Sequence, residues 1–165
     1  MNPFPLIRIE PLGIEALDMR PAQQALRVQY GCLYYLSDAC LRDVAALWGV
    51  MLPSPYMYDV GVFRNARSIL HRTGRSEAEI RLACSPSGLW AMDTSYMLPL
   101  SGHGAAPSVW NPVAFLNEAD AVAGGLHELI ESLGRIASSS RSDASEALRL
   151  MDILKAERTP QLSLF

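Results

Sequence analysis

The stretch EIRLACSPSGLWAMDTSYML, residues 79–98, decides the fold predicted for this chain. Residues 79–84 alternate polar and apolar side chains, which is typical of a strand with one buried face. Ser85-Pro86-Ser87-Gly88 follows, and this composition favours a tight turn. Residues 89–98 then return as a second strand. The stretch therefore predicts a β-hairpin.

The residues after the hairpin predict a loop, a short strand and a long helix. Glycine and proline make 99–112 an exposed loop, and 113–115 form a third short strand. Asn117, with Asp120 three residues later, is a good N-terminal cap for a helix to 137. The apolar stripe of this helix consists of Ala119, Val122, Leu126, Leu129, Ile130, Leu133 and Ile136. Residues 79–137 thus predict a β-β-(β)-α unit, and the fold class is α+β with a small antiparallel sheet packed against helices.

The first 36 residues predict two extended segments and a short helix. Leu6–Ile9 lie among prolines and glycines and favour an extended conformation. Residues 14–24 predict a brief helix that Pro21 breaks. Residues 25–36 are rich in aromatic and apolar types and predict a strand, with a helix as the alternative.

Two further helices are predicted before the hairpin. Ser37 is a candidate N-cap for a helix that ends at Gly49. Asp59 is a candidate cap for a second helix, whose stripe runs to Leu70 and which Gly74 would close.

The C-terminal part predicts a helix on a linker. Residues 1–137 form the predicted α+β domain, 138–143 a serine-rich linker, 144–158 a helix, and 159–165 an extended tail. Ala147, Leu150, Met151 and Leu154 share one face of that helix.

Composition indicates a single-domain protein without membrane spans. The chain has 165 residues, half of them apolar, and a formal net charge of −3. This length suffices for a core, and the charge excludes a strongly basic nucleic-acid binder. No apolar run is long enough to cross a bilayer, and the first residues lack a signal-peptide pattern, so we expect a cytoplasmic protein. The three cysteines show no metal-binding spacing, and we expect neither a metal nor a cofactor.

The last five residues, Gln161-Leu162-Ser163-Leu164-Phe165, carry most of the functional information. Their large apolar side chains follow Pro160, which ends the preceding helix. Exposure of each costs about 1.5–3 kcal/mol relative to burial, so the peptide is expected to dock on a surface. That surface belongs to another protein, to the chain's own domain or to a second copy.

All five positions match a known interaction motif. The peptide resembles the one by which bacterial proteins bind the β sliding clamp of DNA polymerase III, with the pattern Gln-Leu-(Ser or Asp)-Leu-Phe. A five-position match at one fixed place arises by chance about once in 10⁵–10⁶ chains. The resemblance implies that the Gln161 amide meets polar groups of the clamp, that Leu164 and Phe165 fill an apolar pocket, and that Leu162 packs at the rim. Ser163 is then a small spacer.

A basic segment is the second candidate site. The residues Arg64, Arg67, His71, Arg72 and Arg75 lie close together in sequence and are candidate phosphate contacts. Arg64, Arg67 and His71 share one side of the helix predicted there. The alternative is a solvated helix face.

Isolated histidines and aromatics carry weaker signals. His103 is a candidate catalytic or ligand residue, or simply a loop histidine, because no partner stands at a useful spacing. Trp90, Trp110 and Tyr96 are candidates for stacking on bases, or else core residues of the hairpin.

Three functions are compatible with these features. The first is a bacterial clamp-binding adaptor of DNA replication or repair, which reaches DNA through the clamp. The second is an enzyme or enzyme subunit of DNA metabolism that the same tail tethers. The third is a self-associating structural protein. Residues 79–137 also resemble an uncharacterised segment of accessory proteins of plasmids and integrative elements, on Gly88-Leu89-Trp90, Pro107-Ser108-Val109 and the pattern from Phe115 to Leu133. That resemblance implies a plasmid or mobile element as the source.

Overall fold

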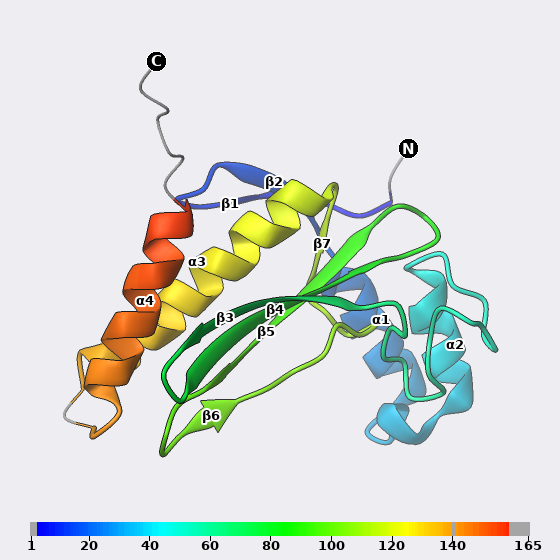
Figure 1. The fold of residues 1–165 in the computed structure, drawn as a ribbon. Coiled ribbons are helices and arrows are strands. Elements are labelled where there is room, and N and C mark those ends of the chain that lie inside the picture. The colour runs from blue at the N-terminus through cyan, green and yellow to red at the C-terminus, as the bar shows by residue number, and fades with distance from the viewer. Residues whose placement is uncertain (1–2, 140, 159–165) are drawn as a thin grey trace.

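The structure is a computed structural model that describes residues 3–139 and 141–158. Its strands form one seven-stranded sheet in the order β1-β2-β7-β5-β4-β3, with β6 paired to β5 (Figure 1). The strands are β1 (Leu6–Ile9), β2 (Ile14–Asp18), β3 (Arg67–Thr73), β4 (Ser76–Cys84), β5 (Trp90–Met97), β6 (Gly102–His103) and β7 (Val113–Phe115). The helices are α1 (Arg20–Tyr30), α2 (Asp38–Ala46), α3 (Glu118–Ala137) and α4 (Ala144–Arg158), and a 3₁₀ turn, η1, covers Tyr34–Leu36. The pairings are antiparallel, and the predicted α+β class is confirmed.

The predicted hairpin is the centre of the sheet. Strands β4 and β5 pair along their length, with Ile80 opposite Thr94, and Gly88 takes a φ of 81° in the turn between them. That left-handed conformation suits glycine because it has no Cβ. The alternation of β4 buries Ile80 and Leu82 in the core that α3 covers, while Glu79 and Arg81 occupy the opposite face.

Helix α3 crosses one face of the sheet (Figure 1). As predicted, Asn117 caps it, and its side-chain oxygen accepts a hydrogen bond of 2.8 Å from the backbone nitrogen of Asp120. Most of the predicted stripe is buried, but Ala119 is exposed and Val122 only partly buried. Ala121, Gly124 and Gly125 are buried near the start of the helix.

The helix approaches the sheet closely at Gly125. A Cβ on this residue would lie 2.6 Å from Cγ2 of Ile80, a buried β-branched side chain with little freedom to move. Gly125→Ala is therefore expected to destabilise the protein by about 1–3 kcal/mol, in urea denaturation, through overpacking. Gly134→Ala in the same helix is the control, because its nearest contact would be an ordinary 3.5 Å to Sδ of Met151. Equal stability of the two variants would contradict this packing.

Helix α4 packs against α3 and shares its core. Ala147, Leu150, Met151 and Leu154 are buried, as the sequence pattern predicts. The connection to α3 is tied to the sheet, because the buried carboxylate of Asp143 accepts hydrogen bonds from the backbone of Leu100 and the hydroxyl of Ser101. Helix α4 is thus held on the body at its N-terminal end.

A second core lies under α1 and α2. It is built around Trp48, which is fully buried and meets the Phe63 ring edge-on at 5.6 Å. Ser37 caps α2 as predicted, and its hydroxyl accepts from the backbone nitrogen of Cys40 at 3.1 Å. Helix α2 ends at Ala46, and Gly49 follows with a φ of 73°.

For residues 14–36 the preferred prediction, a helix followed by a strand, was wrong, and the helix alternative for residues 25–36 is confirmed as far as Tyr30. Residues Ile14–Asp18 form β2, which pairs with β1 and β7, and residues Arg20–Tyr30 form α1 instead of a strand. Pro21 lies in the first turn of this helix instead of breaking one, because the first helical turn needs no backbone donor there. Gly31 then ends it with a φ of 76°.

The helix predicted from Asp59 to Leu70 was also wrong. Residues 67–73 form β3, which pairs with β4 from Arg67–Leu82 to Thr73–Ser76. Gly74, with a φ of 58°, lies in the tight turn of that hairpin and closes no helix. The 3–4 spacing of apolar residues in this segment was coincidental, because the strand partly buries alternate positions, Ile69, His71 and Thr73. The predicted loop 99–112 contains the short strand β6.

Candidate functional site

The candidate clamp motif lies outside the described residues. Gln161, Leu162, Ser163, Leu164 and Phe165 follow α4 after a two-residue interval, 159–160. Helix α4 is the last described element, and its contacts with α3, β3 and β4 hold it on the body. The candidate motif therefore comes directly after an anchored helix in the sequence.

The basic segment does not form one helix face, because its residues lie on a loop, on β3 and in the following turn. Arg67 and His71 share one face of β3, while Arg72 belongs to the other, as expected for odd and even positions of a strand. Arg64 precedes the strand, and Arg75 is exposed in the turn after it.

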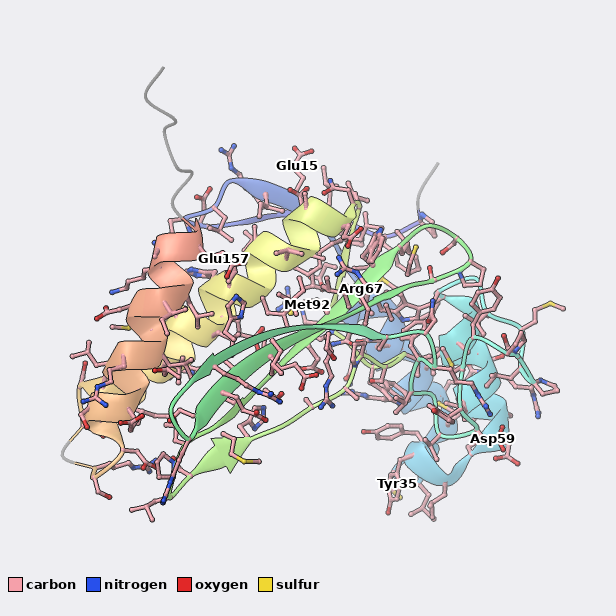
Figure 2. All side chains as sticks on the ribbon, viewed as in Figure 1. Glu15, Tyr35, Asp59, Arg67, Met92 and Glu157 are labelled. Atoms are coloured by element: carbon pink, nitrogen blue, oxygen red, sulfur yellow. The ribbon has the colours of Figure 1, made fainter. Side chains whose placement is uncertain are left out.

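Four of these side chains have partners within the body. Arg67 pairs with Glu118, and His71 contacts Glu157 of α4. Figure 2 labels Arg67 and Glu157 on these elements. Arg72 pairs with Glu77 at 3.2 Å, and the Arg64 guanidinium lies 4.4 Å from the centre of the Tyr58 ring. The two arginine–carboxylate pairs offset much of the positive charge that the segment offers to a phosphate, whereas the contact of Arg64 with a neutral ring leaves its charge in place.

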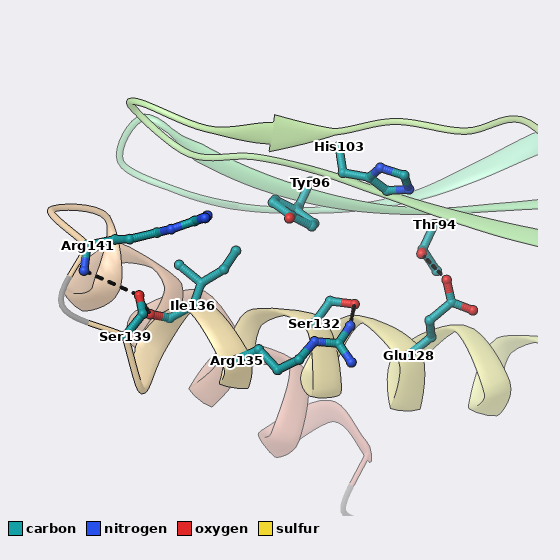
Figure 3. A pocket seen from close by; sticks show the side chains of 9 residues that line it. All are labelled: Thr94, Tyr96, His103, Glu128, Ser132, Arg135, Ile136, Ser139 and Arg141. Carbon is teal, nitrogen blue, oxygen red and sulfur yellow. Dashed lines mark hydrogen bonds between the residues drawn. The ribbon is translucent and has the colours of Figure 1, made fainter.

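A polar pocket of about 710 Å³ lies between β5, β6 and the C-terminal half of α3 (Figure 3). It is lined by Thr94, Tyr96, His103, Glu128, Ser132, Arg135, Ile136, Ser139 and Arg141. The Thr94 hydroxyl donates to Glu128 at 2.7 Å, and Arg135 donates to the Ser132 hydroxyl at 3.2 Å. Thus the pocket combines hydroxyls with charges of both signs.

A second pocket, of about 490 Å³, continues from the first where β5 and β7 separate. The two strands pair only at Trp90 and Phe115, and the Asn111 amide bridges the gap by donating to the carbonyl of Met92 at 3.0 Å. Both pockets share Glu128, Ser132 and Arg135 on α3, and the second adds Asp93, His127 and Glu131. The sequence analysis did not predict these two adjoining pockets, because their residues come from distant segments that only the fold brings together.

His103 lines the first pocket from β6, and its ring centre lies 6.1 Å from that of Tyr96, its partner in the strand register. Its side chain is exposed. Among the described residues, no group of three or more His, Cys, Asp or Glu side chains is placed to hold a metal ion. The pocket can bind a polar ligand, but its hydrogen bonds do not define an acid–base pair at His103.

A third pocket, of about 590 Å³, lies beside α1. Its wall consists of Arg20, Pro21, Gln23, Gln24, Arg27, Trp110 and Pro112. The guanidinium carbon of Arg27 lies 5.0 Å from the centre of the Trp110 ring and 5.2 Å from that of Tyr34. Trp110 is thus partly buried, because it packs against the second core and its ring centre lies 5.3 Å from that of Tyr34, while the rest of the side chain lines the pocket.

The open face of the sheet carries a charged network around Glu79. The Arg81 guanidinium, 2.8 Å away, and hydroxyl donors from Ser68 and Ser95 hold the pKa of Glu79 below its ordinary value. A depressed pKa means that the ionised carboxylate stabilises the folded state above the unfolded value of 4.5 and that this stabilisation is lost as pH falls through the folded value.

Glu79→Gln is therefore expected to lower the free energy of unfolding at pH 7 and to have a much smaller effect at pH 3. Urea denaturation at both pH values measures the difference. Glu15→Gln, on the exposed side of β2, is the matched control and should change little at either pH. A Glu79→Gln effect that is the same at both pH values would contradict the role of the carboxylate charge.

Comparisons with protein-family models, curated proteins and solved structures find no match to this chain. Within the described residues, no helix is both long and apolar enough to span a membrane.

Proposed function

We propose that this protein is a bacterial adaptor of DNA replication or repair that binds the β sliding clamp through residues 161–165. The observation that carries the proposal is the five-position match of Gln161-Leu162-Ser163-Leu164-Phe165 to the clamp-binding pattern. The position of the match supports it, because an interaction peptide that follows an anchored helix can engage a partner while the body remains folded.

The residue types suit an extended peptide that docks in a pocket. Leu164 and Phe165 act as the apolar anchors, and Gln161 offers both a donor and an acceptor to a polar subsite. Ordering the peptide costs conformational entropy, so its affinity is modest. The clamp encircles DNA, and the bound protein is therefore held at high local concentration near DNA. Its net charge of −3 is compatible with this indirect route.

Competition follows from this mode of binding. One pocket holds one peptide, so the protein displaces other clamp-binding proteins while it is bound. In this proposal it works in the cytoplasm and is encoded by a plasmid or mobile element, in line with the resemblance of residues 79–137.

The test is a direct binding measurement with a purified bacterial β clamp. The full chain is immobilised and compared with a chain that lacks residues 161–165. We expect binding at micromolar concentrations for the full chain and none for the shortened chain. No binding of the full chain at high micromolar concentration would overturn the proposal.

The enzyme alternative has one observation in its favour, which is the polar pocket that contains His103. In that case the tail is a tether and the pocket holds the substrate. His103→Ala would then abolish a nuclease or nucleotide-hydrolysis activity while clamp binding persists. For the adaptor we expect no such activity in either the native chain or the variant.

A further inference from the structure

The outward face of α1 forms a positively charged pocket with Trp110. Arg20, Gln24 and Arg27 recur at helical spacing along this face, and no acidic side chain lines the pocket. Helix α1 itself contains no acidic residue. The wall of this pocket therefore carries positive charge in a protein that is acidic as a whole.

The charge of Arg27 is not neutralised within the described part of the chain. Arg20 pairs with Asp18 at 2.7 Å, whereas no described carboxylate forms a salt bridge with Arg27. Its guanidinium instead lies against Tyr34 and Trp110, and its buried Nε has no hydrogen-bond partner there. The aromatic rings hold the cation in place and leave it free to pair with an anion that enters the pocket.

Trp110 is presented by a rigid loop. The buried amide of Gln23 donates to the carbonyls on both sides of it, Val109 at 3.0 Å and Asn111 at 2.9 Å. The indole of Trp48 also donates to the Val109 carbonyl at 3.0 Å. Because these bonds are buried, the loop keeps its shape without a ligand, and little entropy is lost when one binds.

We propose that this pocket binds single-stranded nucleic acid, with a base against the Trp110 ring and the phosphate backbone at Arg27. A base supplies a π-face and the backbone a row of negative charges, which are the two chemistries that the pocket offers. Arg27 and Tyr34 cover part of the Trp110 ring, and the part that lines the pocket is the surface a base would contact. An acidic peptide would pair with Arg27 but would not use this aromatic surface. Exposed bases are found in single strands, so a duplex fits less well.

This site is separate from residues 161–165 and does not depend on the proposed clamp contact. Sequence-independent binding to nucleic acid usually has a dissociation constant of roughly 10⁻⁴–10⁻⁶ M near physiological salt. A contact of that strength becomes effective when a tether holds the protein close to DNA.

The test uses a fluorescein-labelled oligo(dT) of fifteen nucleotides and the full chain. Fluorescence anisotropy at several salt concentrations gives the affinity and its salt dependence, and tryptophan emission reports stacking. We expect binding that weakens with salt, quenched emission, and weaker binding to a duplex of the same length. Arg27→Gln should reduce the slope of log affinity against log salt by about 0.7. Trp110→Ala should weaken binding roughly ten-fold.

Three further variants separate the site from general effects. Gln24→Glu adds a negative charge at an exposed position of the pocket and should weaken binding without loss of folding, which circular dichroism checks. Arg149→Gln removes the same charge as Arg27→Gln, but from the exposed surface of α4, and should leave binding unchanged. Trp110→Phe keeps a stacking surface and should bind within about three-fold of the native chain but lose the quenching.

Several outcomes would overturn the proposal. They are an absence of oligonucleotide binding, equal effects of Arg27→Gln and Arg149→Gln, and quenching that survives in Trp110→Phe. The result is independent of the clamp experiment, because deletion of residues 161–165 should leave oligonucleotide binding intact. The variants of the α1 pocket should likewise bind the clamp as the native chain does.

Discussion

Replacement of both Leu164 and Phe165 by alanine is expected to weaken binding to a bacterial β clamp by at least about 100-fold. In the clamp-binding proposal these two side chains fill the apolar pocket, and truncation of such an anchor typically costs 2 kcal/mol or more, about 30-fold in affinity. The effects of two neighbouring anchors need not add, so 100-fold is a lower expectation. Surface plasmon resonance with immobilised clamp measures the change.

The matched control is Ser163→Asp. The family pattern accepts either residue at this position, so we expect affinity within about three-fold of the native chain. In this proposal residues 161–165 contact the clamp and not the body, so the thermal unfolding of both variants should equal that of the native protein. If the double alanine variant binds the clamp as tightly as the native chain, residues 161–165 are not the clamp contact.

Trp48→Ala is expected to destabilise the protein by about 3–5 kcal/mol, the usual cost of removing a large buried aromatic side chain. Trp48 is fully buried at the centre of the second core, and its ring packs against Phe63. Its indole nitrogen also donates to Val109, so the substitution removes a hydrogen bond as well as packing. Urea denaturation followed by far-ultraviolet circular dichroism gives the free energy of unfolding.

Trp48→Phe separates the two contributions. It keeps most of the ring volume and loses the indole donor, while Gln23 still donates to the same carbonyl of Val109. We expect a clearly smaller loss than for Trp48→Ala. A loss below 1 kcal/mol in Trp48→Ala would show that Trp48 is not central to this core.

The hairpin and α3 were predictable because their signals are local. Residues 79–98 contain an alternating segment, 79–84, and their own turn, and Asn117 caps the helix with its own side chain. Each of these features needs only neighbours in sequence. The burial of α4 followed from its apolar face in the same way.

The errors arose where the local signal was compatible with two structures. The apolar and aromatic residues of 25–36 favoured a strand, yet several are exposed on α1 and the residues after it, such as Val28, Leu33 and Tyr35. Tyr35 lies near α1 and α2, on the side of the molecule away from α4 (Figure 2). Residues 67–73 became a strand because β4 offers an edge that pairs with them, which the segment alone cannot reveal.

The candidate sites also differ in whether their residues are neighbours in sequence or only in the folded structure. The candidate clamp motif is contiguous, and so the amino-acid sequence by itself was enough to propose it. The sequence also determined the fold class, through hydrophobic periodicity and caps. Only the tertiary structure decided that the basic segment is largely paired within the body, and that Arg27 and Trp110, 83 positions apart, meet in one pocket. The physical reason is that periodicity and capping act between near neighbours, whereas a pocket depends on which distant segments pack together.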